Sequence, residues 1–263
     1  MKNILLLLGL LLFLTACQNS ADEMKKKAEA TTAQITKTID YPEAMNKVFD
    51  NHGSLAKWKS QKTMSYEIVK EDGNEKQLID LQNRWEKIEA PSFISGYDGK
   101  EYWVEADTTY KGNPKFYTNL MFYFYAMPFV LADEGINYDK TEAITFDGVT
   151  YPGYRISYGD NVGVSPEDEY FIYYHPESYE MAWLGYTVTY FSGEPSKKIS
   201  YIRYDDWKNF NGLKLPNSLT WYKVEDSKIT EPRNTREFVN VAVSDQVTPN
   251  STFVKTAGAR VVE

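Results

Sequence analysis

The side chains most often used for catalysis and metal binding are scarce in this chain. Its 263 residues include one cysteine, Cys17, and two histidines, His52 and His175. A Ser-His-Asp triad would have to use one of these histidines, and a metal site needs several converging His, Cys or carboxylate ligands. Each histidine adjoins a turn signal, Asn-His-Gly and His-Pro respectively, so we expect both to be surface turn residues. Because the chain also lacks a P-loop, a dinucleotide-binding motif and a serine-hydrolase motif, we predict no catalytic residue, no metal and no cofactor.

Carboxylates are plentiful, and the densest groups are Glu167-Asp168-Glu169 and Asp205-Asp206. Strand alternation would place Glu167 and Glu169 on one face, where they could hold a calcium ion or a sugar hydroxyl, or simply face solvent. A glycoside hydrolase needs two carboxyl groups about 5–10 Å apart across a cleft. A hydrolase is therefore a distant third interpretation of the sequence.

The single cysteine follows a segment that is typical of a signal peptide. Lys2 precedes an apolar stretch, residues 4–14. This stretch is too short to span a membrane, which takes about 20 residues. Leu14-Thr15-Ala16-Cys17 then resembles the bacterial lipobox, in which the cysteine is acylated and the chain is cut before it. We predict a signal peptide over residues 1–16 and lipidation, as with palmitate, at Cys17, which would anchor the protein to a membrane.

The residues after the cysteine bear on where the protein resides. By resemblance to enterobacterial sorting, Gln18 favours the outer membrane. Acidic residues come only at Asp22 and Glu23, before three lysines, which favours a periplasm-facing protein over a surface-exposed one. Residues 17–40 contain no aromatic side chain. We expect them to be a lipidated N-terminus and a tether to the domain. Residues 41–263 are long enough for a single domain.

Composition narrows the classes of partner. The formal net charge of −8 disfavours nucleic acid, whose phosphates attract basic proteins. A single cysteine allows no internal disulfide. Aromatic residues make up 15% of the chain, with 21 tyrosines, which suits β-sheets and sites that hold lipid or sugar. We expect a monomer with no nucleic-acid partner.

The pattern after residue 62 is that of strands. Asp98-Gly99 and Asp147-Gly148 stand between apolar runs and predict hairpins, and residues 78–88 read as one strand. Roughly ten strands with regular turn signals indicate one curved antiparallel sheet, a barrel or half-barrel. The apolar segment Phe116–Leu131 is too short to span a membrane and predicts a buried helix, kinked or restarted at Pro128.

The order of these motifs resembles the LolA/LolB lipoprotein-carrier superfamily, and in particular a Bacteroidota outer-membrane lipoprotein family of that fold. The resemblance rests on YDGKEYW, FYTNLMFYFYAMPFVLADEG, DGVTYPGYRISYG and FNGLKLPNSLTWYKV, and it covers about residues 42–255. It implies a mostly β (α+β) fold, a curved antiparallel half-barrel of about eleven strands with helices on its concave face. In the carriers that face holds acyl chains under a helical lid. Unlike the soluble carrier, this chain has a cysteine, Cys17, that we predict to carry a lipid anchor.

The resemblance and the aromatic strands together predict a hydrophobic cavity. Its candidate lining residues are Trp85, Trp103, Phe116, Leu120, Phe124 and Met127. We expect a non-enzymatic envelope lipoprotein that binds lipid or a lipoprotein acyl chain. The alternatives are a module that binds a glycan or a protein through exposed aromatic residues and, third, a hydrolase.

Overall fold

A computed structural model describes residues 40–108, 110–158, 168–188 and 198–262. Residues Tyr41–Glu263 form one compact unit. Cys17, Glu167 and the predicted signal peptide and tether lie outside the described residues, so the predictions made for them stay predictions.

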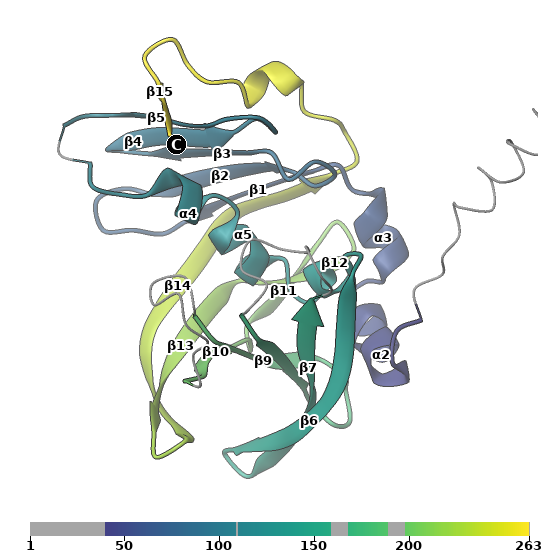
Figure 1. Ribbon diagram of the computed structural model, residues 1–263. Helices are drawn as coiled ribbons and strands as arrows, with labels where there is room; N and C mark the ends of the chain where they lie inside the picture. The colour runs from purple at the N-terminus through teal and green to yellow at the C-terminus, as the bar shows by residue number, and fades with distance from the viewer. Residues whose placement is uncertain (1–39, 109, 159–167, 189–197, 263) are drawn as a thin grey trace, which may run out of the picture. The chain divides into compact units, whose positions relative to one another are not determined.

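Most of this unit is one antiparallel sheet (Figure 1), with the strand order β15-β5-β4-β3-β2-β1-β14-β13-β10-β9-β8-β7-β6. Its strands are β1 (Thr63–Ile68), β2 (Glu75–Asp80), β3 (Glu86–Ala90), β4 (Phe93–Tyr97), β5 (Tyr102–Ala106), β6 (Ile136–Phe146), β7 (Val149–Tyr158), β8 (Tyr170–Tyr174), β9 (Met181–Tyr186), β10 (Ser200–Arg203), β13 (Ser218–Glu225), β14 (Lys228–Ser244) and β15 (Arg260–Val262). A separate ribbon pairs β11 (Trp207–Phe210) with β12 (Leu213–Pro216). The helices are α2 (Glu43–Asn51), α3 (Leu55–Ser60), α4 (Pro114–Tyr117), α5 (Leu120–Tyr125) and the 3-10 helices η1 (Phe129–Ala132) and η2 (Asn250–Thr252).

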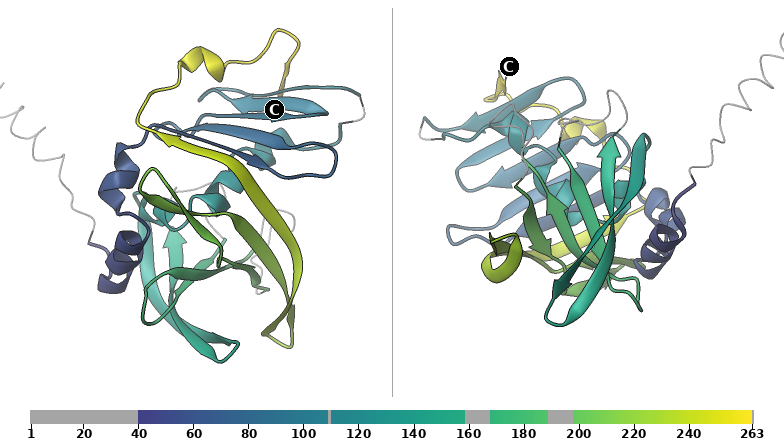
Figure 2. Two further views of the ribbon diagram at one scale, coloured as in Figure 1. Left: turned by 180° about the vertical axis from the view of Figure 1, so that it is seen from behind. Right: turned by 60° about the horizontal axis from the view of Figure 1, so that its bottom comes forward.

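Strand β14 joins the two halves of the sheet. It is 17 residues long. Its first part pairs with β13, and its last part pairs with β1. Figure 2 shows it running from the layer of β1–β5 into the curved layer that ends at β6. Helices α4 and α5 lie within the curve (Figure 1). The structure confirms the predicted mostly β, curved antiparallel sheet with helices on its concave face; the described residues form 13 strands in this sheet, against about eleven expected.

The hairpin turns follow the sequence, whereas one predicted strand is interrupted. Gly99 and Gly148 adopt the left-handed φ values of 92° and 78° that these turns require. The strand expected over 78–88 is instead two strands, β2 and β3, with a turn between them. The Asp80 carboxylate accepts the backbone N–H groups of Gln82 and Asn83 at 2.9 and 2.7 Å, which stabilises that turn.

The apolar segment Phe116–Leu131, predicted as a helix kinked or restarted at Pro128, forms three short helical pieces. The Asn113 side chain caps α4 by accepting the backbone N–H of Phe116. Asn119 then adopts a left-handed conformation, φ 60°, which separates α4 from α5. Pro128 stands immediately before η1 and lacks the N–H that a continuous helix would use. The break at Pro128 was predicted; the break at Asn119 was not.

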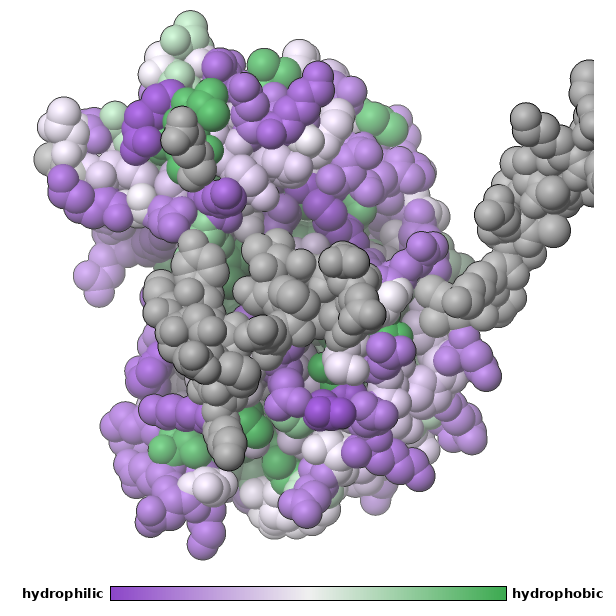
Figure 3. Space-filling model, in the orientation of Figure 1, coloured by the Kyte–Doolittle hydropathy of each residue, from purple (hydrophilic) through white to green (hydrophobic). Residues whose placement is uncertain are grey.

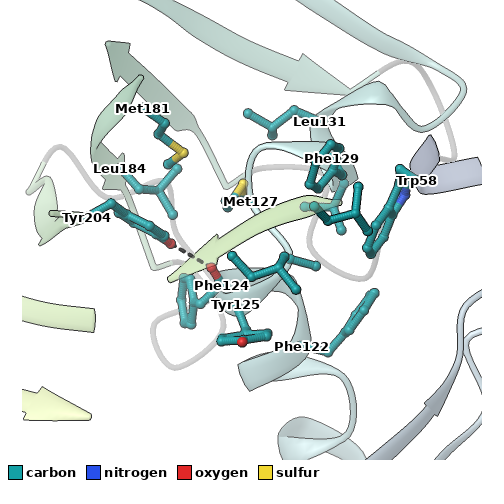
Figure 4. Close-up of a cluster of buried hydrophobic side chains, with 14 of the residues drawn as sticks. Trp58, Phe122, Phe124, Tyr125, Met127, Phe129, Leu131, Met181, Leu184 and Tyr204 are labelled. Carbon is teal, nitrogen blue, oxygen red and sulfur yellow. Dashed lines mark hydrogen bonds between the residues drawn. The ribbon is translucent and has the colours of Figure 1, made fainter. Parts of the chain in front are cut away.

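These pieces pack into the main hydrophobic core (Figure 4). Trp58 of α3 stacks on Phe129 with ring centroids 4.9 Å apart and planes within 8°. The Tyr204 hydroxyl donates to the carbonyl oxygen of Phe124 at 2.7 Å, the dashed line in the close-up. Tyr125 contacts Tyr66 of β1 at a centroid distance of 4.5 Å. The helical segment is therefore held between α3 and the concave face of the sheet.

A second, smaller apolar cluster lies on the other face of the sheet. Leu184 of β9 belongs to the main core, so its neighbour Trp183 points the opposite way. Trp183 contacts Phe146 and Tyr222, each at a centroid distance of 4.9 Å. In the space-filling view, hydrophobic side chains reach the surface in the lower part of the molecule, near the ends of the β6–β7 and β13–β14 hairpins (Figure 3).

Candidate functional site

A cavity of about 540 Å³ opens beside α4 and α5 on the concave side of the sheet. We call it the groove. Among the described residues it is lined by Ile68, Lys70, Glu75, Phe93, Tyr110, Gly112, Asn113, Phe116, Tyr117, Leu120, Met121, Phe124, Tyr186, Trp221, Arg233, Asn234 and Arg236. Helical residues thus form one wall, and residues of strands β1, β2, β4, β9, β13 and β14 form much of the rest.

The helical wall of the groove is apolar and contains three of the six predicted cavity residues. Phe116 and Leu120 are half-buried, and Phe124 is buried. Phe124 contacts Tyr186 and Trp221 across the groove, with ring centroids 5.1 and 6.0 Å away. The Trp221 indole N–H donates to the Tyr186 hydroxyl at 2.9 Å, so the polar edges of these two rings are satisfied and their faces are left for apolar contact.

The other three predicted cavity residues, Trp85, Trp103 and Met127, do not line the groove. Met127 is enclosed in the main core. Trp103 pairs with Gly96, one residue away from the inward-facing pair Ser95 and Val104, and therefore points to the outer face of the sheet.

Trp103 and Trp85 both meet the C-terminal segment on that outer face. The Trp103 indole N–H donates to the Phe253 carbonyl at 2.9 Å, and the Trp85 ring lies 6.1 Å from the Phe253 ring. These two tryptophans pack the C-terminal segment against the sheet and do not line the groove.

A buried carboxylate, Glu75, forms the polar floor of the groove. It accepts hydrogen bonds from the Lys70 ammonium at 2.5 Å, from Gln77 at 2.7 Å and from the Tyr117 hydroxyl at 2.7 Å. Burial, followed by the charge of Glu75, raises the pKa of Tyr117, so this hydroxyl stays protonated and donates to Glu75. The negative charge of Glu75 is thus matched by Lys70 within the groove.

A second buried carboxyl group, Glu86, holds the junction between α4 and α5. Its Oε2 accepts the backbone N–H of Asn119 at 2.6 Å, and the Asn119 side chain donates to the Arg84 carbonyl at 2.9 Å. Burial raises the pKa of Glu86 to about 8, and the hydrogen bond from Asn119 opposes the rise. Glu86 is therefore mostly neutral at pH 7, which suits a carboxyl group enclosed in the core.

Sequence reasoning did not find Glu75 and Glu86, although a signal was present. Glu75, Gln77 and Ile79 alternate along β2, and the last of them belongs to the core. Extending the strand pattern back to Glu75 would have assigned a charged side chain to the inner face. The predicted strand begins at Leu78, three residues after the start of β2, and so does not include Glu75.

The histidines form no site with the groove residues. His175 accepts the backbone N–H groups of Glu177 and Ser178 and acts as a turn residue, as predicted. His52 ends α2 as predicted, but it is fully buried, so the expectation of a surface position was wrong. Its ring meets Trp207 at 4.4 Å and its Nδ1 lies 2.7 Å from the Val48 carbonyl, and burial lowers its pKa to about 4.

Three of the acidic side chains singled out from the sequence lie close to basic side chains. Glu169 pairs with Arg155 at 2.7 Å, and Asp205 lies 3.5 Å from Arg203. Asp206 lies 3.1 Å from Lys208. Within the described ranges, no three His, Cys, Asp or Glu side chains gather as metal ligands would. Those ranges also hold no helix with the length and apolarity that a membrane crossing requires.

Comparison with known proteins places the chain in a family. The DUF6503 model, described as a family of unknown function, matches residues 99–232, just over half of the 263 residues. The chain belongs to this family. The matched part includes α4, α5 and Trp221, and so most of the groove wall.

Solved structures with a similar fold include a LolA superfamily protein from Nitrosomonas europaea, with 9% identity and a TM-score of 0.44 over 79% of this chain and 96% of that one. A DUF1329 family protein from Desulfovibrio piger shares 8% identity, with a TM-score of 0.46 over 81% and 98%. A putative outer membrane lipoprotein-sorting protein domain from Vibrio parahaemolyticus shares 6%, with a TM-score of 0.42 over 80% and 94%. A comparison with curated protein sequences gives no match.

Proposed function

We propose that this protein is a non-enzymatic envelope lipoprotein that holds an apolar ligand, a lipid or a lipoprotein acyl chain, in the groove. The observation that carries the proposal is the apolar wall of Phe116, Leu120 and Phe124 beside a cavity of about 540 Å³. Ligand sites have volumes of about 300–1,000 Å³ and apolar linings with a few polar groups. Each methylene group moved from water into such a groove stabilises the complex by about 0.8 kcal/mol.

The proposal includes a lipid anchor at Cys17, in the outer membrane and with the domain facing the periplasm. Residues 1–16 would be the signal peptide, and residues 17–40 would tether a monomeric domain. The support is the lipobox-like sequence before Cys17. Cys17→Ala should release the protein from the membrane fraction with its fold intact; a variant that stays in the membrane fraction would contradict the anchor.

The alternative of a glycan-binding module has less support among the described residues. A second cavity, of about 340 Å³, is lined by the aromatic residues Trp58 and Phe129 together with polar groups such as Arg84 and Asp133. Sugar rings stack on exposed aromatic faces, but Trp58 and Phe129 stack on each other and are buried. This cavity therefore offers no aromatic platform.

Dye binding tests the proposed ligand site. The chain from Gln18 to Glu263 would be titrated with N-phenyl-1-naphthylamine, an uncharged dye that fluoresces in apolar surroundings. We expect saturable binding that Leu120→Trp weakens about tenfold, equivalent to about 1.4 kcal/mol, because the larger ring fills the groove. Tyr123→Trp on the same helix is the matched control, since Tyr123 is 39% exposed and does not line the groove. Absence of binding, or equal binding by both variants, would reject the site.

A further inference from the structure

The groove has a cationic rim on its β14 side, at Arg233 and Arg236. We infer that this rim selects amphiphiles with an anionic head group, a carboxylate or a phosphate, which the two arginines bind while the apolar chain lies along α4 and α5. The inference rests on the proposed function of the groove and adds the chemical class of its ligand.

The charge balance of the groove is opposite to that of the chain. The whole sequence carries 37 acidic and 29 basic side chains. The described groove lining carries three basic residues, Lys70, Arg233 and Arg236, and one acidic residue, Glu75. Since Glu75 is paired with Lys70, the two arginines are the charges of the lining that have no carboxylate partner among the residues that the structure describes.

Arg236 is on the face of β14 that elsewhere builds the core. It stands opposite Leu219 in the register of β13 and β14, and directly opposed residues share a face of a sheet. Leu219 is fully buried in the main core, and Phe238, two residues beyond Arg236 on β14, is fully buried there too. Arg236 therefore continues this inward-facing row at the point where the core gives way to the groove.

Arg233 reaches the groove because the strand is irregular there. Trp221 pairs with Asn234 and Tyr222 pairs with Pro232, so Arg233 is an extra residue in β14 with no partner in the register. A β-bulge of this kind turns a side chain away from its regular direction. Its effect here is to add a second guanidinium to the rim beside Trp221.

Both arginines are exposed, and neither forms an ion pair with a carboxylate in the part of the chain that the structure describes. Their charges nevertheless act on the groove wall. Burial raises the pKa values of Tyr117 and Tyr186, and the positive charges of Arg236 and Arg233, respectively, oppose that rise. Paired guanidinium groups bind carboxylate and phosphate oxygens through charge-assisted hydrogen bonds.

Displacement of the dye tests the inference with probes that share one dodecyl chain and differ in head group. The probes are dodecyl phosphate, dodecyl maltoside and dodecyltrimethylammonium, each below its micellar concentration and with the chain from Gln18 to Glu263. We expect dodecyl phosphate to displace the dye at about tenfold lower concentration than the other two, as a hydrogen-bonded ion pair would produce. Inorganic phosphate alone should not displace the dye.

Two variants locate the effect. Arg233→Gln and Arg236→Gln should each reduce the preference for dodecyl phosphate over dodecyl maltoside, and together abolish it, with the preference measured as the ratio of the two displacing concentrations within each variant. Lys228→Gln is the control, because Lys228 is an exposed cation of the same strand that does not line the groove. High salt should weaken the preference in the same way, since exposed charges are screened.

The outcomes separate the inference from the function beneath it. Equal displacement by all three probes, or a preference that survives the double arginine variant, overturns the anionic head group while the groove remains a lipid site. If inorganic phosphate, which has no apolar chain, displaces the dye, the inference of an amphiphilic ligand is overturned in favour of a site for free anions. If the dye and every probe fail to bind the folded protein, the proposed function and the inference both fall.

Discussion

The two ends of the apolar segment Phe116–Leu131 have different surroundings. At its start, Phe116 and Leu120 are half-buried and line the groove. At its end, Phe129 and Leu131 are enclosed in the core, with exposed fractions of 0% and 1%. Both ends carry large apolar side chains, so the presence of such side chains alone does not distinguish a groove wall from a core.

What differs is the element that each end meets. The Trp58 ring of α3 covers Phe129 face to face, so Phe129 is fully buried although the second cavity lies beside the pair. Opposite Leu120, the strands present charged and polar side chains of the sheet, Glu75 and Arg236 among them. These groups must remain hydrated or paired, so Phe116 and Leu120 stay only half-buried, whereas Phe124 is covered by Tyr186 and Trp221. The following predictions test this contrast, beginning with the largest expected effect.

Truncation at the enclosed end should cost the most stability. We expect Phe129→Ala to lower the free energy of unfolding by about 3–5 kcal/mol, because it removes a buried ring and the stacking partner of Trp58. Urea denaturation measures the change. Tyr123→Ala, at an exposed ring of α5, should change it by about 1 kcal/mol or less. Equal losses in the two variants would contradict the contrast.

The buried carboxyl group Glu86 should make stability depend on pH. Its pKa is about 8 in the folded protein against an ordinary 4.5. Between these values the folded state binds more protons than the unfolded state, so stability falls as pH rises, by at most about 1.4 kcal/mol per pH unit. Glu86→Gln keeps an acceptor for the Asn119 N–H and cannot ionise, so it should remove this fall.

The measurement is the difference between the two proteins in unfolding free energy from pH 4.5 to pH 8. His52, whose pKa is lowered to about 4, loses its contribution as pH falls below about 6.5, which is the opposite sense. That effect is common to both proteins and cancels in the difference. Parallel curves would show that Glu86 does not carry a raised pKa.

Removing one donor from the groove floor should have a smaller effect. Tyr117→Phe leaves the Glu75 carboxylate with Lys70 and Gln77 alone, and should lower the free energy of unfolding by about 1–3 kcal/mol. Tyr102→Phe is the matched control, because it also removes one hydroxyl group from a half-buried ring, in this case a ring stacked on Tyr97. An unchanged Tyr117→Phe protein would mean that water replaces the lost donor.

Truncation at the open end should matter least for stability. Leu120→Ala removes a side chain that is only half-buried, so we expect a smaller loss than for Phe129→Ala, about 1–2 kcal/mol by urea denaturation. Its effect should appear instead as weaker dye binding. A loss as large as that of Phe129→Ala would place Leu120 in the core and not in a groove wall.

Local patterns in the sequence predicted much of the fold. Asp98-Gly99 and Asp147-Gly148 make the predicted turns, because the conformations that these turns need are set by the residues themselves. Strand alternation correctly indicated a large antiparallel sheet. Strand alternation did not predict the turn after Asp80. Asp80 is the last residue of β2, and its carboxylate also accepts the backbone N–H groups that form the turn.

The candidate site was predicted only in part. Phe116, Leu120 and Phe124 came from an apolar run and do line the groove. Trp85 and Trp103 came from apolar strands too, but a shift of one residue decides which face a strand residue occupies. That parity depends on pairing with β3, β4 and the C-terminal segment, which no local pattern contains.

The sequence by itself determined the strand-rich character, the hairpin turns, the apolar helical segment and the lipobox-like motif, since each depends on neighbouring residues. Only the tertiary structure decided which end of the helical segment is enclosed and which borders the groove. It also brought Glu75 of β2 to Tyr117 of α4, and Arg236 of β14 to the same cavity. These contacts join residues from 42 to more than 100 positions apart, so they follow from strand register and packing and not from local propensity.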